Sequence, residues 1–463
     1  MASIKKSILL STFYYLLLPL GNAQSLIEPV LLEPIQQAVS ENAEVKIKLL
    51  EQESTIQEAG VVKAKKLPQI SADAGYGYLF TRTNIDLPTQ YLPITGRPIF
   101  DGSQSAHLKS HVITAGISVQ QVIFAGLQIP NGIKALEEKE KSLQFQAEAG
   151  KETVAKEVIT TFDQLMLLNE IDILIDDSEK RLNKEHQKVI KAIENGLAIP
   201  YDREKIKLAM LELEEKKLEV ENNRNLLYSK LQYLTKMSKA QLEAITYKLQ
   251  PIDIDIVHLS PNNRAELKAL EAGKKAKEYV YLKEKGTKLP TIFAFGNLSY
   301  VNALHPSLKL KDIPIFGDVQ FNANHLSAAP MTLVGAGIKW DIFSGGEKNK
   351  KIEIAKLDVE MMDIRLQDTQ EKLNLLFEKT KNDYFSSKKG VAVVEQKIVV
   401  SKNNLHLASK QYSLGLTDLT ERLASENEYY TVSLNYYNQI LQQRSTAIEL
   451  LHATGQLLDE IYK

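Results

Sequence analysis

Hydrophobic and polar positions alternate in four stretches of the chain, and each alternation predicts a β-strand. In the first stretch, apolar residues at every second position from 70 to 80 are separated by small or polar residues. Similar patterns cover 113–123, 291–301 and 332–343, the third being the least regular. A period of two residues places alternate side chains on opposite faces of a strand. We therefore predict two β-hairpins, at about 68–124 and 290–343, each with an apolar and a small-polar face.

The two strands of each hairpin are expected to be joined by a loop. The first loop, roughly 84–105, is rich in Pro, Thr and Gly. The second passes through His305, Pro306, Pro314 and Gly317. Proline and glycine favour turns over regular structure.

Long charged stretches between the hairpins carry apolar residues at helical spacing, such as Val154, Val158 and Phe162. The distance from Gly126 to Gly196, and from Gly345 to Gly415, is 70 residues. A continuous helix of that length would reach about 105 Å. The chain is expected to turn after each helix and run back, over 198–234 and 417–454. Further helices are predicted at about 36–66 and 263–288.

Four short motifs occur twice in the same order. KLPQISA (66–72) returns as KLPTIFA (288–294), and AEVK (43–46) as AELK (265–268); IFAG (123–126) returns as IFSG (342–345), and NGL (195–197) as LGL (414–416). The chain is thus a tandem duplication. We divide it into a first repeat at 24–234, an insertion at 235–262 and a second repeat at 263–463. The predicted fold class is α+β, mostly α.

Residues 1–23 have the pattern of a secretory signal peptide. Lys5 and Lys6 precede an apolar run from Ile8 to Leu18, and small residues follow, ending in Ala23. The run of about 11 apolar residues is shorter than the ~20 that a membrane-spanning helix needs. We expect cleavage after Ala23 and export from the cytoplasm.

Composition excludes several functions. The chain has no cysteine, so disulfides, thiolate metal sites and a lipid-modified N-terminal cysteine are excluded. Its 57 basic and 58 acidic residues nearly cancel and form no dense basic block, so nucleic acid is not a predicted partner. No GxSxG, HExxH or Walker motif occurs. We predict no catalytic residues, no cofactor and no metal site. No later apolar run reaches spanning length, so helical membrane insertion is excluded. A soluble periplasmic protein or a β-barrel remains possible at this point.

Four strands are too few to close a membrane barrel. The smallest outer-membrane barrels use about eight, and an open sheet edge in lipid is costly. Closure would need other copies of the chain, and the spacing alone allows two copies or three. Trp340, the single tryptophan, lies near the end of the last predicted strand. It fits either a ring at the membrane interface or an ordinary buried aromatic.

These features together resemble the TolC family of outer-membrane efflux proteins. The resemblance lies in the duplicated KLP and IFxG borders, in WDIFSGG (340–346), in NRAELKALE (263–271) and in YSLGLTDLTERLASENEYY (412–430). It covers nearly the whole mature chain. It implies a homotrimer in the outer membrane of a Gram-negative bacterium, with a twelve-stranded barrel and a helical barrel in the periplasm. It also implies two partners, a periplasmic adaptor protein and an inner-membrane transporter of RND or ABC type.

The resemblance also assigns roles to residues near the two turns. The turns would form the periplasmic tip that contacts the adaptor: Asn195, Gly196, Leu197, Leu414, Gly415, Leu416 and Thr417. Acidic residues just beyond the second turn narrow the pore in this family, and here Asp418 and Glu421 match. Where a second acid is common one turn later, this chain has Ala424. The alternative for both acids is an ordinary solvated charge.

The leading hypothesis is therefore a passive outer-membrane export channel. The alternative is a periplasmic adaptor (membrane fusion) protein, which also has a long helical hairpin but should carry one hairpin and a lipoyl-like β module. A barrel enzyme is a third class, and it would need a catalytic constellation that the sequence does not contain.

Overall fold

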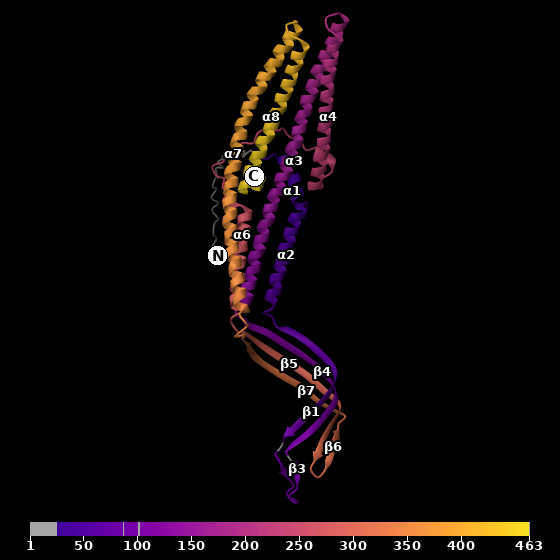
Figure 1. Cartoon of the computed structure of the whole chain (residues 1–463), viewed down its shortest axis with the longest axis vertical. Coiled ribbons are helices and arrows are strands. Elements are labelled where there is room, and N and C mark those ends of the chain that lie inside the picture. The colour runs from indigo at the N-terminus through magenta and orange to yellow at the C-terminus, as the bar shows by residue number, and fades with distance from the viewer. Residues whose placement is uncertain (1–25, 87, 101, 463) are drawn as a thin grey trace, which may run out of the picture. The chain divides into compact units, whose positions relative to one another are not determined.

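The computed structural model describes residues 26–86, 88–100 and 102–462. The predicted signal peptide, 1–23, lies outside the described residues. The chain divides into two compact units. Unit 1 contains the chain up to Lys46, Ala149–Arg264 and Lys372–Lys463; unit 2 contains Ile47–Glu148 and Ala265–Glu371. Each unit therefore draws on both sequence repeats, as the colours in Figure 1 show.

The two repeats build the same helices, residue for residue. Helices α3 (Gln128–Glu194) and α7 (Glu347–Ser413) each have 67 residues. The returning helices α4 (Pro200–Thr235) and α8 (Leu419–Thr454) each have 36. Helices α2 (Ala43–Ala64) and α6 (Ala265–Gly286) each have 22. The duplicated IFxG motif ends in Gly126 and Gly345, which both have φ +61, a left-handed conformation that suits glycine at a sharp entry into a helix.

Unit 1 is helical and has a continuous hydrophobic core. Besides its parts of α3, α4, α7 and α8 it contains η1 (Pro29–Leu31), α1 (Leu32–Glu41), α5 (Lys239–Glu243), η2 (Pro261–Asn263) and α9 (Leu457–Ile461). Its core includes Leu31, Phe162, Leu231 and Leu451, which come from distant parts of the sequence. In the described part of the chain, no helix has an apolar stretch that is long enough to cross a membrane.

The N-terminal helix expected at about 36–66 is two helices. Asn42, between α1 and α2, has an extended backbone (φ −64, ψ 124). Its side-chain oxygen accepts a hydrogen bond from the Val45 backbone N–H, 3.1 Å away. Asparagine is a favoured cap because it satisfies one of the free N–H groups of a helix start. The cap at Asn42 therefore explains the break.

Unit 2 holds an antiparallel sheet. Its order is β1 (Gln69–Asp86), β4 (Ser103–Ala125) and β5 (Thr291–Ile313); β5 then pairs with both β6 (Gly317–Asn322) and β7 (His325–Lys339). A small separate ladder joins β2 (Gln90–Tyr91) and β3 (Pro98–Phe100). Strands β1 and β5 start directly after Pro68 and Pro290, because proline disfavours helix in the residue before it.

The second hairpin differs from the prediction. The expected loop between 301 and 332 is largely strand: β5 continues to Ile313 and β6 and β7 follow. Pro306 fits because the pairing of β4 with β5 is irregular at this level, between Lys109 and His111. Proline is tolerated at such a bulge, where no ladder hydrogen bond is needed from its nitrogen. The last strand also ends earlier than expected, at Lys339 rather than near 343.

Candidate functional site

The two turns between the long helices of unit 1 have the same backbone design. In the first turn, Gly196 has φ 71, and the Leu197 N–H donates to the Ala192 carbonyl at 2.8 Å. In the second, Gly415 has φ 71, and the Leu416 N–H donates to the Gln411 carbonyl at 2.9 Å. This is the Schellman ending of a helix, in which glycine supplies the left-handed residue. Asn195 precedes the first glycine and Thr417 follows the second turn.

The turns present apolar side chains to solvent. Leu197 is 84% exposed, Leu414 72% and Leu416 73%. Behind them a small core of Val189, Ile206 and Leu419 packs α3, α4 and α8 together. The turns are thus rigidly supported at their base while their tips are unusually apolar. An exposed cluster of large apolar residues is typical of a contact surface for another molecule.

The two acids near the second turn have different surroundings. Asp418 is the N-cap of α8, where its Oδ1 accepts a hydrogen bond from the Glu421 backbone N–H at 2.9 Å. Capping α8 gives Asp418 a structural role that is independent of any position in a pore. The Glu421 side chain is exposed, one turn into the helix. The Glu421 carboxylate is therefore accessible to ions in the solvent.

A buried ion cluster lies just after these acids, and the sequence analysis missed it. The Glu426 carboxylate lies 3.0 Å from Arg422 Nη1 and 2.8 Å from Arg181 Nε. The side chains of Arg422 and Glu426 are only 4% and 6% exposed. Glu426 thus links α8 to α3. Its position in the buried cluster sets it apart from a pore-lining acid.

A second buried cluster joins four distant segments of unit 1. Arg444 Nη2 lies 2.8 Å from a Glu28 carboxylate oxygen and 2.9 Å from Asp163 Oδ1. Arg444 Nη1 donates to the Gln250 carbonyl at 2.8 Å. The Tyr247 hydroxyl donates to Asp163 Oδ1 at 2.5 Å. The cluster therefore ties the N-terminal segment and the insertion to α3 and α8.

Burial controls the proton affinities in this cluster. Burial raises the pKa of the Asp163 carboxyl, and the positive charge of Arg444 opposes that shift. Burial also raises the pKa of Tyr247, so its hydroxyl keeps the proton that it donates to Asp163. Burial alone would lower the pKa of Arg444, but the charges of Asp163 and Glu28 outweigh it and the net shift is upward. Arg444 is therefore a buried cation that depends on its two acids.

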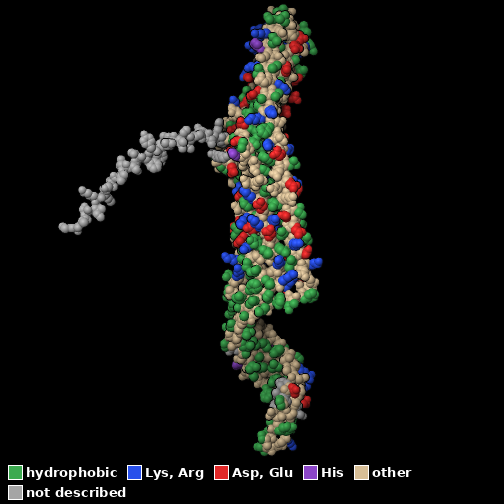
Figure 2. All heavy atoms as spheres, turned by 90° about the vertical axis from the view of Figure 1, so that its left-hand side faces the viewer, with side chains coloured by type: hydrophobic (Ala, Val, Ile, Leu, Met, Phe, Trp, Pro, Cys, Tyr) green, Lys and Arg blue, Asp and Glu red, His purple; other side chains and the backbone are tan. Residues whose placement is uncertain are grey.

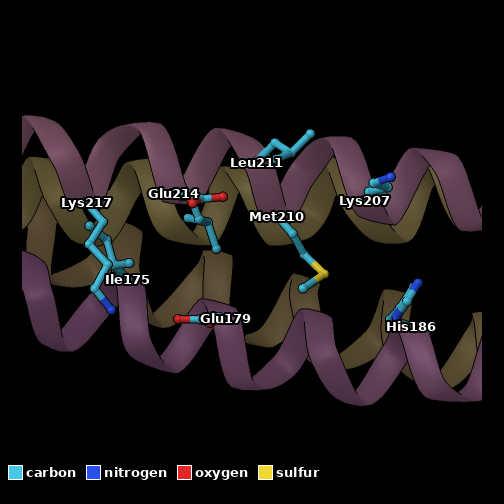
Figure 3. A pocket seen from close by; sticks show the side chains of 9 residues that line it. Ile175, Glu179, His186, Lys207, Met210, Leu211, Glu214 and Lys217 are labelled. Atoms are coloured by element: carbon cyan, nitrogen blue, oxygen red, sulfur yellow. The ribbon is translucent and has the colours of Figure 1, made fainter.

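A cavity of about 540 Å³ lies between α3 and α4 in unit 1. Figure 3 shows Met210 of α4 reaching into the space between the two helices, with Glu179 and His186 on α3 facing it. The rest of the lining is charged at Lys207, Glu214 and Lys217 and apolar at Ile175, Leu211 and Leu213. Among the residues that the structure describes, no group of three or more His, Asp or Glu is placed to hold a metal ion. The cavity has a mixed lining without a convergent polar group.

Most of the exposed large apolar side chains of the unit 2 sheet lie on one of its faces. We call this the apolar face. Its members come from β1, β4, β5 and β7: Ile70, Tyr76, Tyr78, Phe80, Ile113, Ile117, Leu298, Tyr300, Val334 and Ile338. Their exposed fractions run from 37% at Ile113 to 78% at Val334. Figure 2 shows hydrophobic side chains gathered over the sheet. The alternation predicted from sequence in β1 and β4 is confirmed by the pairing of Ile70 with Val119 and of Tyr76 with Ile113.

The opposite face of the sheet is small and polar over much of β1 and β4, but on β7 it also exposes Met331 (54%) and Leu333 (60%). Ser71 and Ser118 are hydrogen-bonded through their hydroxyls at 2.7 Å. Asp73 lies against Gly116, whose Cβ position would be 3.2 Å from the carboxylate. Asn297 and Ser299 continue this face on β5, opposite Ser118 and Gly116. We call it the polar face.

Two glycines in β7 make room for aromatic rings from β5. A Cβ on Gly337 would lie 2.6 Å from the Phe293 ring, and one on Gly335 would lie 3.0 Å from the Phe295 ring. The rings cover the bare backbone of the neighbouring strand, as in the pairing known as aromatic rescue of glycine. These contacts, which lie on the polar face, hold β7 in register with β5.

Trp340 follows the last residue of β7. Its Nε1 donates to the Lys288 carbonyl at 3.0 Å, and the residue is 57% exposed. The ring is therefore anchored by its polar edge and open on the rest of its surface. This combination of apolar body and bonded N–H is what favours tryptophan at a membrane interface.

Both edges of the sheet are open. Among the described residues, no strand pairs with the outer edge of β1 or with the outer edge of β7. Each edge therefore presents unpaired backbone N–H and C=O groups along a long strand. Such edges are templates for pairing with another chain.

Comparison with known proteins identifies the fold. No protein-family model matches the chain, and no curated protein matches it in sequence. A membrane protein from Pseudomonas aeruginosa is similar in structure, with TM-score 0.74, 13% identity and coverage of 92% of this chain and 94% of that one. The CmeC outer membrane channel of Campylobacter jejuni has TM-score 0.69, 13% identity and coverage of 92% and 86%. The outer membrane protein VceC of Vibrio cholerae has TM-score 0.68, 15% identity and coverage of 91% and 95%.

The chain therefore has the fold of these outer-membrane proteins. The predicted fold class, mostly α with long antiparallel helical hairpins and four principal strands per chain, is confirmed. The adaptor alternative is not supported, because it requires one helical hairpin and a lipoyl-like β module. The described residues form two long helical hairpins and a sheet with an exposed apolar face.

Proposed function

We propose that this chain is one protomer of a homotrimeric outer-membrane export channel similar to the TolC family. One observation carries the proposal: the sheet exposes its apolar face and leaves both edges unpaired. Such a sheet would expose large apolar side chains to water if the chain stayed alone. Lipid would cover the apolar face, and neighbouring copies would pair the edges. The fold shared with CmeC, which is an outer membrane channel, supports the same conclusion.

The number of copies follows from strand arithmetic together with the resemblance. Four strands per chain give eight in a dimer and twelve in a trimer, and outer-membrane barrels use even numbers from eight upwards. The TolC resemblance selects the trimer. Strand β1 of one copy would then pair with β7 of the next.

The height of the apolar face suits a bilayer. Ile70 and Phe80 are ten residues apart on β1. At about 3.3 Å per residue this is about 33 Å along the strand, and a tilt of about 40° reduces it to about 25 Å in height. The apolar band of outer-membrane barrels is also about 25 Å tall. Aromatic residues near one border of the band and Trp340 near the other would form the two interfacial girdles.

The polar face would line the channel. Hydroxyl, amide and carboxylate groups on this face bind water, so a wide lumen would stay hydrated and let solutes pass without chemistry. We expect no enzymatic activity and no cofactor. The energy for export would come from the partners, an inner-membrane transporter of RND or ABC type and a periplasmic adaptor protein.

The turns of unit 1 would form the periplasmic end that contacts the adaptor. This assignment covers Asn195, Gly196, Leu197, Leu414, Gly415, Leu416 and Thr417, and the exposed leucines support it. Glu421 would form a ring of three carboxylates in the trimer, which attracts cations and hinders anions. Asp418 would contribute mainly by fixing the start of α8.

Cysteine cross-linking tests the closed trimer, because the chain has no cysteine of its own. Ala72→Cys on β1 would be combined in turn with Val334→Cys, Ala336→Cys or Ile338→Cys on β7. After oxidation of outer-membrane fractions, at least one pair should give covalent dimers and trimers on a denaturing gel.

The matched control is the pair Ala74→Cys with Ala115→Cys, which are opposite each other within one chain. This pair should give a monomer only. Absence of covalent oligomers for every edge pair, or recovery of the protein as a soluble monomer, would reject the channel.

A further inference from the structure

Basic residues follow the aromatic end of the apolar face. After Tyr76, Tyr78 and Phe80, the next residue of β1 on the same face is Arg82. In the ladder, Lys109 lies opposite Phe80 and His107 lies opposite Arg82. Strand β5 adds Lys309, which is paired with His107. We call Arg82, His107, Lys109, Lys309 and Lys311 the basic cluster.

The cluster is only partly neutralised by the protein itself. Lys309 Nζ lies 3.1 Å from an Asp318 carboxylate oxygen, with both side chains exposed. Arg82, Lys109 and Lys311 have no ion pair among the residues that the structure describes. Lys109 Nζ instead lies 5.4 Å from the centre of the Phe80 ring. Arg82 and Lys109 therefore remain available to a ligand, and Lys311 is attracted by Asp318 without forming a direct ion pair with it.

His107 lies at the centre of these charges. Arg82, Lys109, Lys309 and Lys311 all act electrostatically on its ring. Its Nε2 is buried and has no hydrogen-bond partner among the described residues. The neighbouring His111 differs, because its Nδ1 is bonded to the Tyr76 hydroxyl at 2.7 Å. One ring nitrogen of His107 therefore has no partner in the described part of the chain.

This arrangement is unfavourable without an anion. Like charges that are close together on one face of a sheet repel each other. Arg82 and Lys309 lie on either side of His107 in one cross-strand row. An anion with several oxygens would remove the repulsion and accept hydrogen bonds from more than one side chain. Phosphate groups suit both guanidinium and ammonium donors.

We propose that the basic cluster binds the phosphorylated headgroup of a lipid in the outer leaflet, of the lipid A class. The inference rests on the proposed function, because it needs the apolar face to be in the membrane. The aromatic residues then lie at the membrane surface, and the basic cluster lies at the level of the headgroups. Basic side chains at this level attract anionic lipids. Acyl chains against Tyr78 and Phe80 would add the apolar contact that free phosphate lacks.

The experiment uses the purified oligomer in detergent, titrated with fluorescent lipid A. The test variant is R82Q/K109Q/K311Q, which removes the three charges without an ion pair in the described chain. The control variant is K379Q/K389Q/K402Q, which removes three exposed lysines of α7. The test variant should bind lipid A on the order of a hundredfold more weakly. The control should bind like the wild type, and added salt should weaken wild-type binding.

Three results would overturn the inference. The first is unchanged affinity of R82Q/K109Q/K311Q, and the second is an equal loss in the α7 control. The third is competition by inorganic phosphate at the concentration of lipid phosphate, which would indicate an anion site without lipid. Phosphatidylcholine should not compete.

Cell fractionation distinguishes a failure of the lipid site from a failure of the proposed channel. All three proteins should reach the outer membrane as heat-labile oligomers. A wild type that does so but does not bind lipid A contradicts only the lipid site. A wild type that does not reach the outer membrane contradicts the channel itself.

Discussion

The helical core of unit 1 buries charged side chains, whereas the sheet of unit 2 exposes large apolar ones. In unit 1, the charged side chains of Arg444 and Asp163 are 2% and 1% exposed, surrounded by packed apolar residues. In unit 2, Val334 is 78% exposed and Ile338 is 72% exposed. Unit 1 buries charged side chains and pairs them with opposite charges from the same chain. The sheet shows apolar surface and leaves its edges unpaired.

The difference indicates what each region needs in order to be complete. The Arg444 cluster of unit 1 takes all its ion-pair partners, Glu28 and Asp163, from its own chain. The sheet is completed only by other molecules, which are lipid on its apolar face and further copies at its edges. We therefore expect mutations in the core of unit 1 to change the stability of the single chain, and mutations in the sheet of unit 2 to change assembly of the oligomer.

The largest effect is expected from Asp163→Ala. This change removes a buried acid and leaves Arg444 with only Glu28, and breaking a buried ion pair on one side costs about 3–5 kcal/mol. Chemical unfolding followed by circular dichroism should show the loss. The double variant Asp163→Ala with Arg444→Met should recover much of it, since removing both charges avoids an unpaired one.

An exposed ion pair of the same unit gives the matched control for this prediction. Asp176 lies 3.5 Å from Lys217, and both side chains are more than half exposed. Asp176→Ala should cost less than about 1 kcal/mol, as is usual for surface pairs. Equal losses for Asp163→Ala and Asp176→Ala would contradict the importance of burial in this cluster.

The second effect concerns the two faces of the sheet. Ala115 is on the apolar face, and its neighbour Thr114 is on the polar face at the same depth. An arginine that faces lipid near the middle of the membrane costs about 2–4 kcal/mol, whereas one that faces a lumen costs little. Ala115→Arg should sharply reduce the heat-labile oligomer in outer-membrane fractions, and Thr114→Arg should not. A larger loss of oligomer in Thr114→Arg than in Ala115→Arg would mean that the polar face, and not the apolar face, contacts lipid.

The third effect tests how β7 is held on β5. Gly337→Ala places a methyl group 2.6 Å from the Phe293 ring, which must move. Overpacking of this kind costs about 1–3 kcal/mol. The temperature at which the oligomer dissociates should fall. Gly77→Ala is the control, because no atom lies within 4 Å of the added Cβ, and it should leave that temperature nearly unchanged.

The sequence was informative where structure depends on local patterns. The alternation in β1 and β4, the proline before each hairpin and the glycine of each turn all lie within a few residues of the feature that they specify. These elements follow from the amino-acid sequence alone, because no distant contact is needed to form them. The N-cap role of Asp418 was missed, because the sequence analysis considered this residue only as a pore acid or a solvated charge.

The clusters that depend on distant contacts could not be predicted. Glu28, Asp163, Tyr247 and Arg444 are far apart in the sequence, and nothing local marks any of them as buried. The extension of β5 past Pro306 depends on an irregular pairing with β4, which the proline alone does not reveal. The basic cluster likewise appears only once the strand register places β1, β4 and β5 side by side.

The smallest effect separates the two acids beside the second turn. Asp418→Ala removes the N-cap of α8 and should cost about 1 kcal/mol of stability. Glu421→Gln removes an exposed charge and should change stability by no more than about 0.5 kcal/mol. In single-channel recordings the order should reverse: Glu421→Gln should weaken block of the current by divalent cations, because a ring of carboxylates becomes a ring of amides. Asp418→Asn, which keeps a capping oxygen, is the control for both measurements. Unchanged block in Glu421→Gln would contradict a role for this residue in the pore, and stability lost in Glu421→Gln rather than in Asp418→Ala would contradict the division of roles between the two acids.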